Sequence, residues 1–281
     1  MKKILKDFNE LIMFKHSIFS SPFIFIAMVV AAKGWFGWRL LVLGLLAAVS
    51  ARNFAMSFNR YVDRDIDAKN PRTASRPSVD GRIDEKKQLF FITLNAFVFI
   101  FVAYLINPLA FYLSIPILFI LGGYSLFKRF SSFAHIILGV SLGLAPIAGV
   151  VAVKESIPLW SLLLSLGVMF WVAGFDLLYS LQDIEFDKKE GLHSIPSIYG
   201  EKCTLFISKI FHGLTVIFWL LFVISYKGGF FAYVAVGISA FMLYKEHEIV
   251  NRDFKKIDKA FFTMNGYLGI IFFIFIVLDI L

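Results

Sequence analysis

The stretch NRYVDRDID, residues 59–67, ends a long apolar run and opens a basic loop. Read as a helix, it places Asn59, Asp63 and Asp67 at positions i, i+4 and i+8, so the three side chains share one helix face. Two carboxylates stacked in this way repel each other unless a cation lies between them. Oxygen ligands suit a hard divalent ion, and Mg²⁺ bound by carboxylates commonly bridges to a phosphate.

A second acidic row ends another apolar run far downstream. Asp176, Tyr179, Asp183 and Asp187 stand at i, i+3, i+7 and i+11 of a predicted helix. We call the Asn59, Asp63 and Asp67 row the first ladder, and this row the second ladder. One row at a helix end is often a solvated face or a cap. Two such rows predict a common site for a divalent cation, Mg²⁺, and suggest an internal duplication.

The composition is that of a polytopic membrane protein. The 281 residues are 59% hydrophobic and 17% charged, whereas soluble domains are about 25% charged. Nine apolar runs are long enough to cross a bilayer as helices, some with flanking residues. We therefore expect an all-α membrane protein with nine spans in one domain, residues 1–281. The runs lie near residues 17–32, 39–62, 88–106, 108–126, 133–153, 158–182, 203–225, 228–250 and 259–280.

The distribution of basic residues predicts the orientation. With the N-terminus in the cytoplasm, 23 Lys and Arg residues fall on the cytoplasmic side and only four outside: Lys33, Arg39, Lys154 and Lys227. This asymmetry follows the positive-inside rule. It explains the formal charge of +8 without nucleic-acid binding, for which no recognition module is visible. Both ladders then face the cytoplasm, and no removable signal peptide is expected.

Basic residues crowd beside both ladders, which indicates a polyanionic ligand. Carboxylates that hold a metal and cations that contact phosphate directly suit a diphosphate. If the diphosphate is a leaving group, the same groups stabilise the negative charge that develops as its bond breaks. The membrane setting suggests a long apolar chain attached to it. The basic residues are Arg64, Lys69, Arg72, Arg76, Lys128 and Lys188.

Arg52 is the basic residue that remains inside a predicted span. An intramembrane arginine is costly and usually faces a cavity or a partner. Two interpretations stay open: a structural pair with a buried carboxylate such as Asp176, or a cation that holds an acidic substrate. The five histidines show no paired ligand spacing and are interpreted as non-ligands. Cys203 is the only cysteine, which excludes an internal disulfide.

These motifs resemble those of the UbiA superfamily of intramembrane prenyltransferases. The first ladder followed by NPRTASRP (70–77) is similar to the first signature of the superfamily, and GFDLLYSLQDIEFD (174–187) to the second. The turn YSLFKR (124–129) also resembles the family. The opening FKHSIFSSPF (14–23) is most similar to 4-hydroxybenzoate polyprenyltransferases, especially a subgroup assigned to menaquinone synthesis. One departure is GLHSI (191–195), where the family often has a lysine.

The resemblance implies a bundle around a central cavity that opens to lipid, and Mg²⁺-dependent transfer of a polyprenyl group from its diphosphate to an aromatic acid. The acceptor expected is 4-hydroxybenzoate, with a dihydroxynaphthoate acid as the alternative. A bacterial cytoplasmic membrane with the active site open to the cytoplasm is the implied location. The roles implied are metal binding by Asn59, Asp63, Asp67, Asp183 and Asp187; phosphate contact by Arg72, Arg76 and Lys128; acceptor binding by Asp176 and Arg52; and a place in the site for Tyr179.

Two other classes of function remain as alternatives. One is a transporter or channel for a divalent cation or an anion, with the ladders forming a vestibule. Transporters place their ionisable residues near the midplane, whereas here nearly all lie at one predicted face. The other is a lipid-binding protein without catalysis, which would not need two acidic rows.

Overall fold

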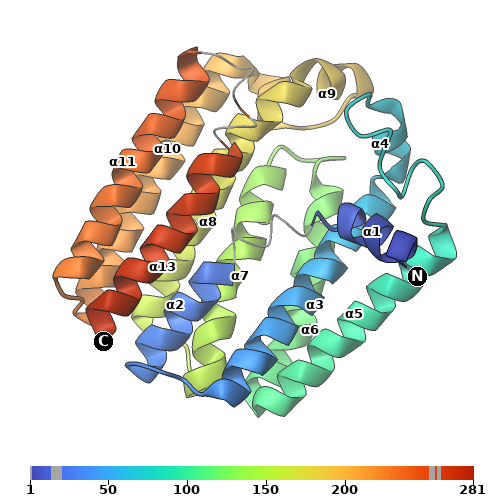
Figure 1. Ribbon diagram of the computed structural model, residues 1–281. Helices are drawn as coiled ribbons and strands as arrows, with labels where there is room; N and C mark the ends of the chain where they lie inside the picture. Colours follow the sequence, from blue (N-terminus) through green and yellow to red (C-terminus); the bar gives the residue numbers. More distant parts are fainter. Residues whose placement is uncertain (1, 14–20, 253–256, 258–260) are drawn as a thin grey trace. The chain divides into compact units, whose positions relative to one another are not determined.

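The computed structural model describes residues 2–13, 21–252, 257 and 261–281, and in these ranges every regular element is a helix (Figure 1). The predicted all-α class is therefore confirmed. The chain divides into two compact units, one of residues 1–17 and 41–126 and one of residues 18–40 and 127–281. The prediction of a single domain over 1–281 stays a prediction.

The first unit holds helices α1 (Lys2–Leu11), α3 (Trp38–Val62), α4 (Arg64–Lys69), α5 (Glu85–Ile106) and α6 (Pro108–Phe127). Its core is small because each long helix buries only one narrow stripe of side chains. The residues of that core are Phe54, Ile92, Phe99, Leu118 and Leu121. Membrane helices commonly leave their other faces to lipid, where apolar side chains need no protein partner.

The turn between α5 and α6 forms at Asn107, as the Asn-Pro pair predicts. Asn107 is extended, with φ −166° and ψ 166°, and its side chain accepts a hydrogen bond from Ala110 N at 2.8 Å. Pro108 then occupies the first position of α6, where a missing N–H costs nothing. The two spans therefore follow each other with a single residue between them.

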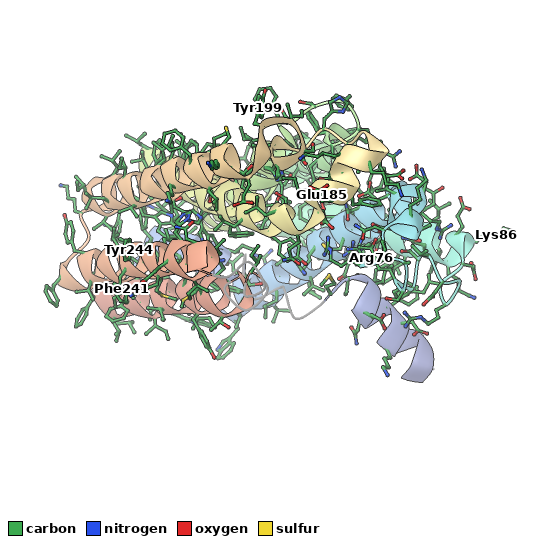
Figure 2. The ribbon with its side chains drawn as sticks, turned by 90° about the horizontal axis from the view of Figure 1, so that it is seen from above. Arg76, Lys86, Glu185, Tyr199, Phe241 and Tyr244 are labelled. Atoms are coloured by element: carbon green, nitrogen blue, oxygen red, sulfur yellow. The ribbon has the colours of Figure 1, made fainter. Side chains whose placement is uncertain are left out.

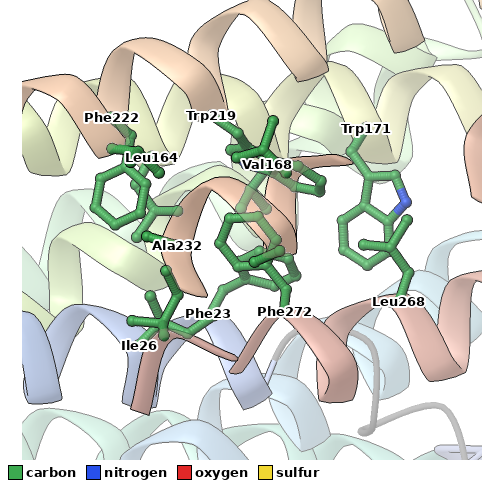
Figure 3. Packing of buried hydrophobic residues seen from close by; sticks show 14 of the residues in the cluster. Phe23, Ile26, Leu164, Val168, Trp171, Trp219, Phe222, Ala232, Leu268 and Phe272 are labelled. Atoms are coloured by element: carbon green, nitrogen blue, oxygen red, sulfur yellow. The ribbon is translucent and has the colours of Figure 1, made fainter. Parts of the chain in front are cut away.

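The second unit holds α2 (Ser21–Ala32), α7 (Ala134–Lys154), α8 (Leu159–Ser180), the 3₁₀ turn η2 (Leu181–Asp183), α9 (Ile184–Glu190), α10 (Ile195–Tyr226), α11 (Phe230–Arg252), the π turn η4 (Phe261–Asn265) and α13 (Gly266–Ile280). Phe23, Trp171, Trp219 and Phe272 meet in its core (Figure 3). Helix α2 packs against α7 and α13, so a segment that precedes the first ladder in sequence belongs to the unit of the second ladder.

Close packing of α7 on α8 depends on two glycines. A Cβ at Gly139 would meet the carbonyl oxygen of Met169, and one at Gly143 would lie 3.0 Å from the carbonyl oxygen of Ser165. Small residues at helix contacts let the backbones approach, as is usual in membranes. The two glycines therefore fix the register of α7 along α8.

Seven helical segments in the described ranges are long and apolar enough to cross a membrane. They are Trp38–Val62, Glu85–Ile106, Pro108–Phe127, Ala134–Lys154, Leu159–Glu190, Ile195–Tyr226 and Thr263–Ile280. The surface is correspondingly apolar: Phe241 and Tyr244 on α11 are 60% and 67% exposed (Figure 2). The chain is an integral membrane protein.

The count of nine spans depends on two further helices. The described part of α2 has 12 residues, and α11 carries Lys245, Glu246 and His247 in its last turns. Nine spans and a cytoplasmic N-terminus stay predictions. Residues 14–20 of the opening motif, with His16, and residues 259–260 of the last predicted span lie outside the described residues.

Candidate active site

The first ladder lies where one helix stops and another starts. Helix α3 ends at Val62, Asp63 has φ −89° and ψ 6°, and α4 begins at Arg64. Backbone hydrogen bonds from Asp63 N to Asn59 O (2.9 Å) and from Asp67 N to Asp63 O (2.7 Å) continue across this break. The continuous helix expected over residues 59–67 is therefore interrupted at Asp63, although its i to i+4 connections remain.

Asn59 holds the Asp63 carboxylate in place. Its Nδ2 donates to Asp63 Oδ2 at 2.9 Å and to Ser125 Oγ, at the end of α6, at 3.3 Å. Asp63 is 2% exposed, and a carboxylate is buried only when its charge is compensated. The amide that the sequence assigned to metal binding thus also orients its neighbouring carboxylate.

Asp67 lies between two arginines. Its Oδ2 is 2.6 Å from Arg76 Nη1 and 3.8 Å from Arg60 Nη1, and the Asp67 and Arg60 side chains are both buried. Arg76 was predicted as a phosphate contact, whereas the role of Arg60 was missed. The signal for Arg60 was its position seven residues before Asp67, which places both on one helix face. Arg72 is exposed in the loop after α4.

Arg52 caps the end of α1 rather than facing lipid. Its Nη2 donates to the carbonyl oxygens of Met13 at 3.0 Å and Ile12 at 3.3 Å. A cation at a helix C-terminus satisfies carbonyls that have no partner within the helix. Arg52 Nε is buried and has no hydrogen-bond partner among the described residues, so the guanidinium keeps a donor for a further acceptor. The pairing with Asp176 stays a prediction.

The second ladder also lies at a helix break. Helix α8 ends at Ser180, the turn η2 follows, and α9 begins at Ile184. Asp183 has φ −102° and ψ 5°, close to the values of Asp63. Both residues lie in the sparsely populated bridge region, where many active-site residues are found. Each is followed four residues later by the last aspartate of its ladder, so the two units repeat one local arrangement.

Asp187 is tied to the loop that follows α9. Ser194 Oγ, which caps the N-terminus of α10, donates to Asp187 Oδ2 at 2.7 Å. In the same loop, His193 N donates to the carbonyl oxygen of Lys128 at 2.8 Å. The loop that departs from the family pattern therefore fastens the turn carrying Lys128 beside the second ladder.

Asp176 and Tyr179 lie one helical turn apart near the end of α8. Asp176 Oδ2 is 2.7 Å from Nδ1 of His135, in the first turn of α7. Tyr179 is half-buried and packs against the cluster that includes Leu178 and Val250. His135 was interpreted as a non-ligand, and its contact with Asp176 was missed because 41 residues separate the two in sequence.

The donors of the two ladders fit a hard divalent cation. The five residues expected to bind the metal, Asn59, Asp63, Asp67, Asp183 and Asp187, offer four carboxylates and one amide oxygen and no sulfur or imidazole, which is the ligand chemistry that Mg²⁺ prefers. Among the described residues, no three His, Cys, Asp or Glu side chains lie where they would hold one ion.

Comparisons with known proteins agree with these motifs. Residues 20–276 match the UbiA prenyltransferase family. A 4-hydroxybenzoate octaprenyltransferase of Serratia proteamaculans (strain 568) is 28% identical over 254 residues, which cover 90% of this chain and 87% of the relative. The apo structure of a UbiA homolog from Aeropyrum pernix K1 is 31% identical, with a TM-score of 0.86 over 95% of this chain and 98% of that chain. A UbiA homolog from Archaeoglobus fulgidus bound to GPP and Mg²⁺ has the same fold, with 20% identity, a TM-score of 0.77 and coverage of 96% and 99%.

Proposed function

Because the chain belongs to the UbiA prenyltransferase family, we propose that it transfers a polyprenyl group from its diphosphate to 4-hydroxybenzoate, as an aromatic prenyltransferase. The observation that carries this function is the repeated arrangement of the ladders, each with one aspartate at a helix break and a second four residues later. Two such rows suit one ligand that carries several negative charges.

The residues proposed to hold Mg²⁺ are Asn59, Asp63, Asp67, Asp183 and Asp187. When bound, the ion neutralises charge on the diphosphate oxygens and makes the diphosphate a better leaving group. Arg72, Arg76 and Lys128 are proposed to contact the phosphate oxygens directly. Arg76 already pairs with Asp67, so its guanidinium is pre-oriented and can keep one N–H on the carboxylate while others reach phosphate.

The acceptor is proposed to bind beside Asp176 and Arg52. Arg52, with its free Nε, pairs with the carboxylate of the aromatic acid, and Asp176 orients the hydroxyl. Tyr179, one turn from Asp176, lines the same part of the site. The apolar surroundings keep water from the allylic cation until the electron-rich ring attacks it beside the hydroxyl. The ring then loses a proton.

A dihydroxynaphthoate acid is the alternative acceptor, since it also carries a carboxylate and a phenolic hydroxyl. The proposed location is a bacterial cytoplasmic membrane, with the site open to the cytoplasm. The 4-hydroxybenzoate octaprenyltransferase relatives support the benzoate over the naphthoate.

The test offers both acids to membranes that contain the protein, Mg²⁺ and a labelled polyprenyl diphosphate, and identifies the products by mass spectrometry. We expect prenylated 4-hydroxybenzoate. Asp63→Ala and Asp183→Ala should each lower transfer by about 1,000-fold, because each removes a carboxylate proposed to hold the Mg²⁺ that would stabilise the leaving diphosphate.

Matched controls lie two residues from each aspartate. Asp65 and Glu185 are exposed carboxylates in the short helices α4 and α9 that follow Asp63 and Asp183, and Asp65→Ala and Glu185→Ala should keep near-normal activity. Normal transfer by Asp63→Ala or Asp183→Ala would mean that the ladders are not the site. No turnover with any aromatic acceptor would reject the enzyme class proposed.

A further inference from the structure

The contact between His135 and Asp176 is built by the register of two helices. His135, Gly139 and Gly143 stand at i, i+4 and i+8 on one face of α7. Gly139 packs on the backbone of Met169, and Gly143 on Ser165, in the antiparallel helix α8. The same register brings His135 opposite Asp176, so the pair is held by two close helix contacts rather than by side-chain flexibility.

The two side chains differ in their exposure. His135 is 7% exposed and Asp176 is 24% exposed. His135 Nε2 is buried and has no hydrogen-bond partner among the described residues, so its one hydrogen bond there is the 2.7 Å contact with Asp176. A carboxylate can only accept, so Nδ1 carries the proton and donates it. The imidazole therefore lies behind the carboxylate, which keeps its exposed side for another molecule.

We propose that His135 is a positioning residue that holds the Asp176 carboxylate to take the proton of the acceptor's hydroxyl, a role that rests on the proposed prenyl transfer. The diphosphate first leaves with the electron pair of the broken C–O bond, and the ring carbon beside the hydroxyl then forms the new C–C bond to the allylic cation. Asp176 takes the hydroxyl proton and the ring becomes a dienone. The ring proton then leaves to water, and Asp176 returns its proton to the oxygen.

The role of His135 predicts that only one of its nitrogens matters. In His135→Asn, the amide Nδ2 takes the place of Nδ1 and can still donate to Asp176. In His135→Gln, the amide sits one bond further out and cannot donate from the same place. Both replacements are polar and fit a buried site, so they form a matched pair for testing geometry rather than burial.

The experiment measures prenylated 4-hydroxybenzoate and released diphosphate in the same reaction. His135→Gln should lower the rate of transfer by about 10- to 100-fold, as is typical when the group orienting a functional residue is lost. His135→Asn should stay within about threefold of the wild type, since the orienting hydrogen bond is kept. The ratio of diphosphate to product should rise in His135→Gln, because ionisation continues while capture by the ring slows.

That ratio separates positioning from folding. A variant that is partly unfolded loses both products equally, and its ratio stays at the wild-type value. Equal activity in the Asn and Gln variants, or an unchanged ratio in His135→Gln, would overturn the role of His135 while the wild type still establishes the prenyl transfer. A wild-type protein without any aromatic prenylation would overturn both. If neither variant folds, the same two products are measured for Asp176→Asn. A ratio of diphosphate to prenylated product equal to that of the wild type would likewise overturn the role of His135.

Discussion

Kinetics can separate the two roles of Arg52, the observed contact with the carbonyls at the end of α1 and the proposed contact with the acceptor carboxylate. Arg52 donates to the carbonyls at the end of α1 and keeps a buried Nε with no partner in the described part of the chain. If it binds the acceptor carboxylate, Arg52→Ala should raise the KM for 4-hydroxybenzoate by about 10- to 100-fold, the worth of a hydrogen bond to a charged group. The KM for the polyprenyl diphosphate should not change. If Arg52→Ala had a normal KM for the acid and faster hydrogen exchange in α1, the role of Arg52 would be structural only.

Asn265 joins two other buried residues of the second unit. It accepts from Trp171 Nε1 at 2.7 Å and donates to Glu246 Oε1 at 2.6 Å, and all three side chains are buried. Asn265→Leu leaves two polar groups without partners and should lower the free energy of unfolding by about 3 kcal/mol. Thermal unfolding in detergent measures this. Tyr267→Leu, at an exposed position of α13, should change stability by no more than about 0.5 kcal/mol. A small loss in Asn265→Leu would mean that water satisfies these groups.

Helix α1 is attached to the loop after α4 through one arginine. Arg82 donates to Glu10 through two bonds of 2.7 Å and to Asp80 at 2.7 Å. The hydrogen bond from Arg82 lowers the pKa of Glu10, and the hydrogen bonds to Glu10 and Asp80 raise the pKa of Arg82. A carboxyl group with a lowered pKa stabilises the attached state fully above its ordinary pKa, and this stabilisation is lost as the pH falls from the ordinary pKa through the lowered one.

We therefore expect α1 to detach as the pH falls below about 4, the ordinary range of a glutamate. Hydrogen exchange of α1, measured at pH 7 and after brief exposure to pH 3, should show loss of protection in α1 before the long helices. In Arg82→Ala the helix should be unprotected at both values. Equal protection of the wild-type helix at pH 7 and pH 3 would contradict this attachment.

The space available to a Cβ atom predicts opposite effects on stability for alanine substitutions at Gly139 and Gly213. Gly139→Ala places a methyl group against the backbone of Met169 and should cost about 1–3 kcal/mol of stability. Gly213, in α10, has open space at its Cβ position, so Gly213→Ala should stabilise its helix by up to about 1 kcal/mol. Unfolding in detergent compares the two. A neutral Gly139→Ala would show that α7 can move along α8 without cost.

At the scale of elements, the sequence predicted what depends on local signals. Hydropathy gave the long helices, and the Asn107-Pro108 pair gave the turn between α5 and α6. The breaks at Asp63 and Asp183 carry no Gly or Pro, so nothing in the sequence marked them. The contacts of His135 and Arg60 were missed for different reasons. His135 pairs with a residue 41 positions away in sequence, and Arg60 was used only as one of the basic residues that predict the orientation in the membrane. Contacts of that kind depend on packing, which helix periodicity does not encode.

For the whole molecule, the proposal that both ladders hold one diphosphate predicts a shared response to ligand. Geranyl diphosphate with Mg²⁺, at 100 times its Kd, should raise the free energy of unfolding by about 2.7 kcal/mol. Removing the metal with EDTA should abolish this stabilisation, and so should either Asp63→Asn or Asp183→Asn. If one of the two variants kept the full effect, the diphosphate would be bound by a single ladder.

The placement of α2 has a consequence for a severed chain. A protease that cut between α6 and α7 would leave an N-terminal fragment that still carries α2, although α2 belongs to the second unit. Phe23 and Ile26 of α2 are completely buried among side chains of that unit, and their exposure would cost several kcal/mol. The nicked halves should consequently copurify without a covalent link, so that cleavage at this point need not release either half from the membrane.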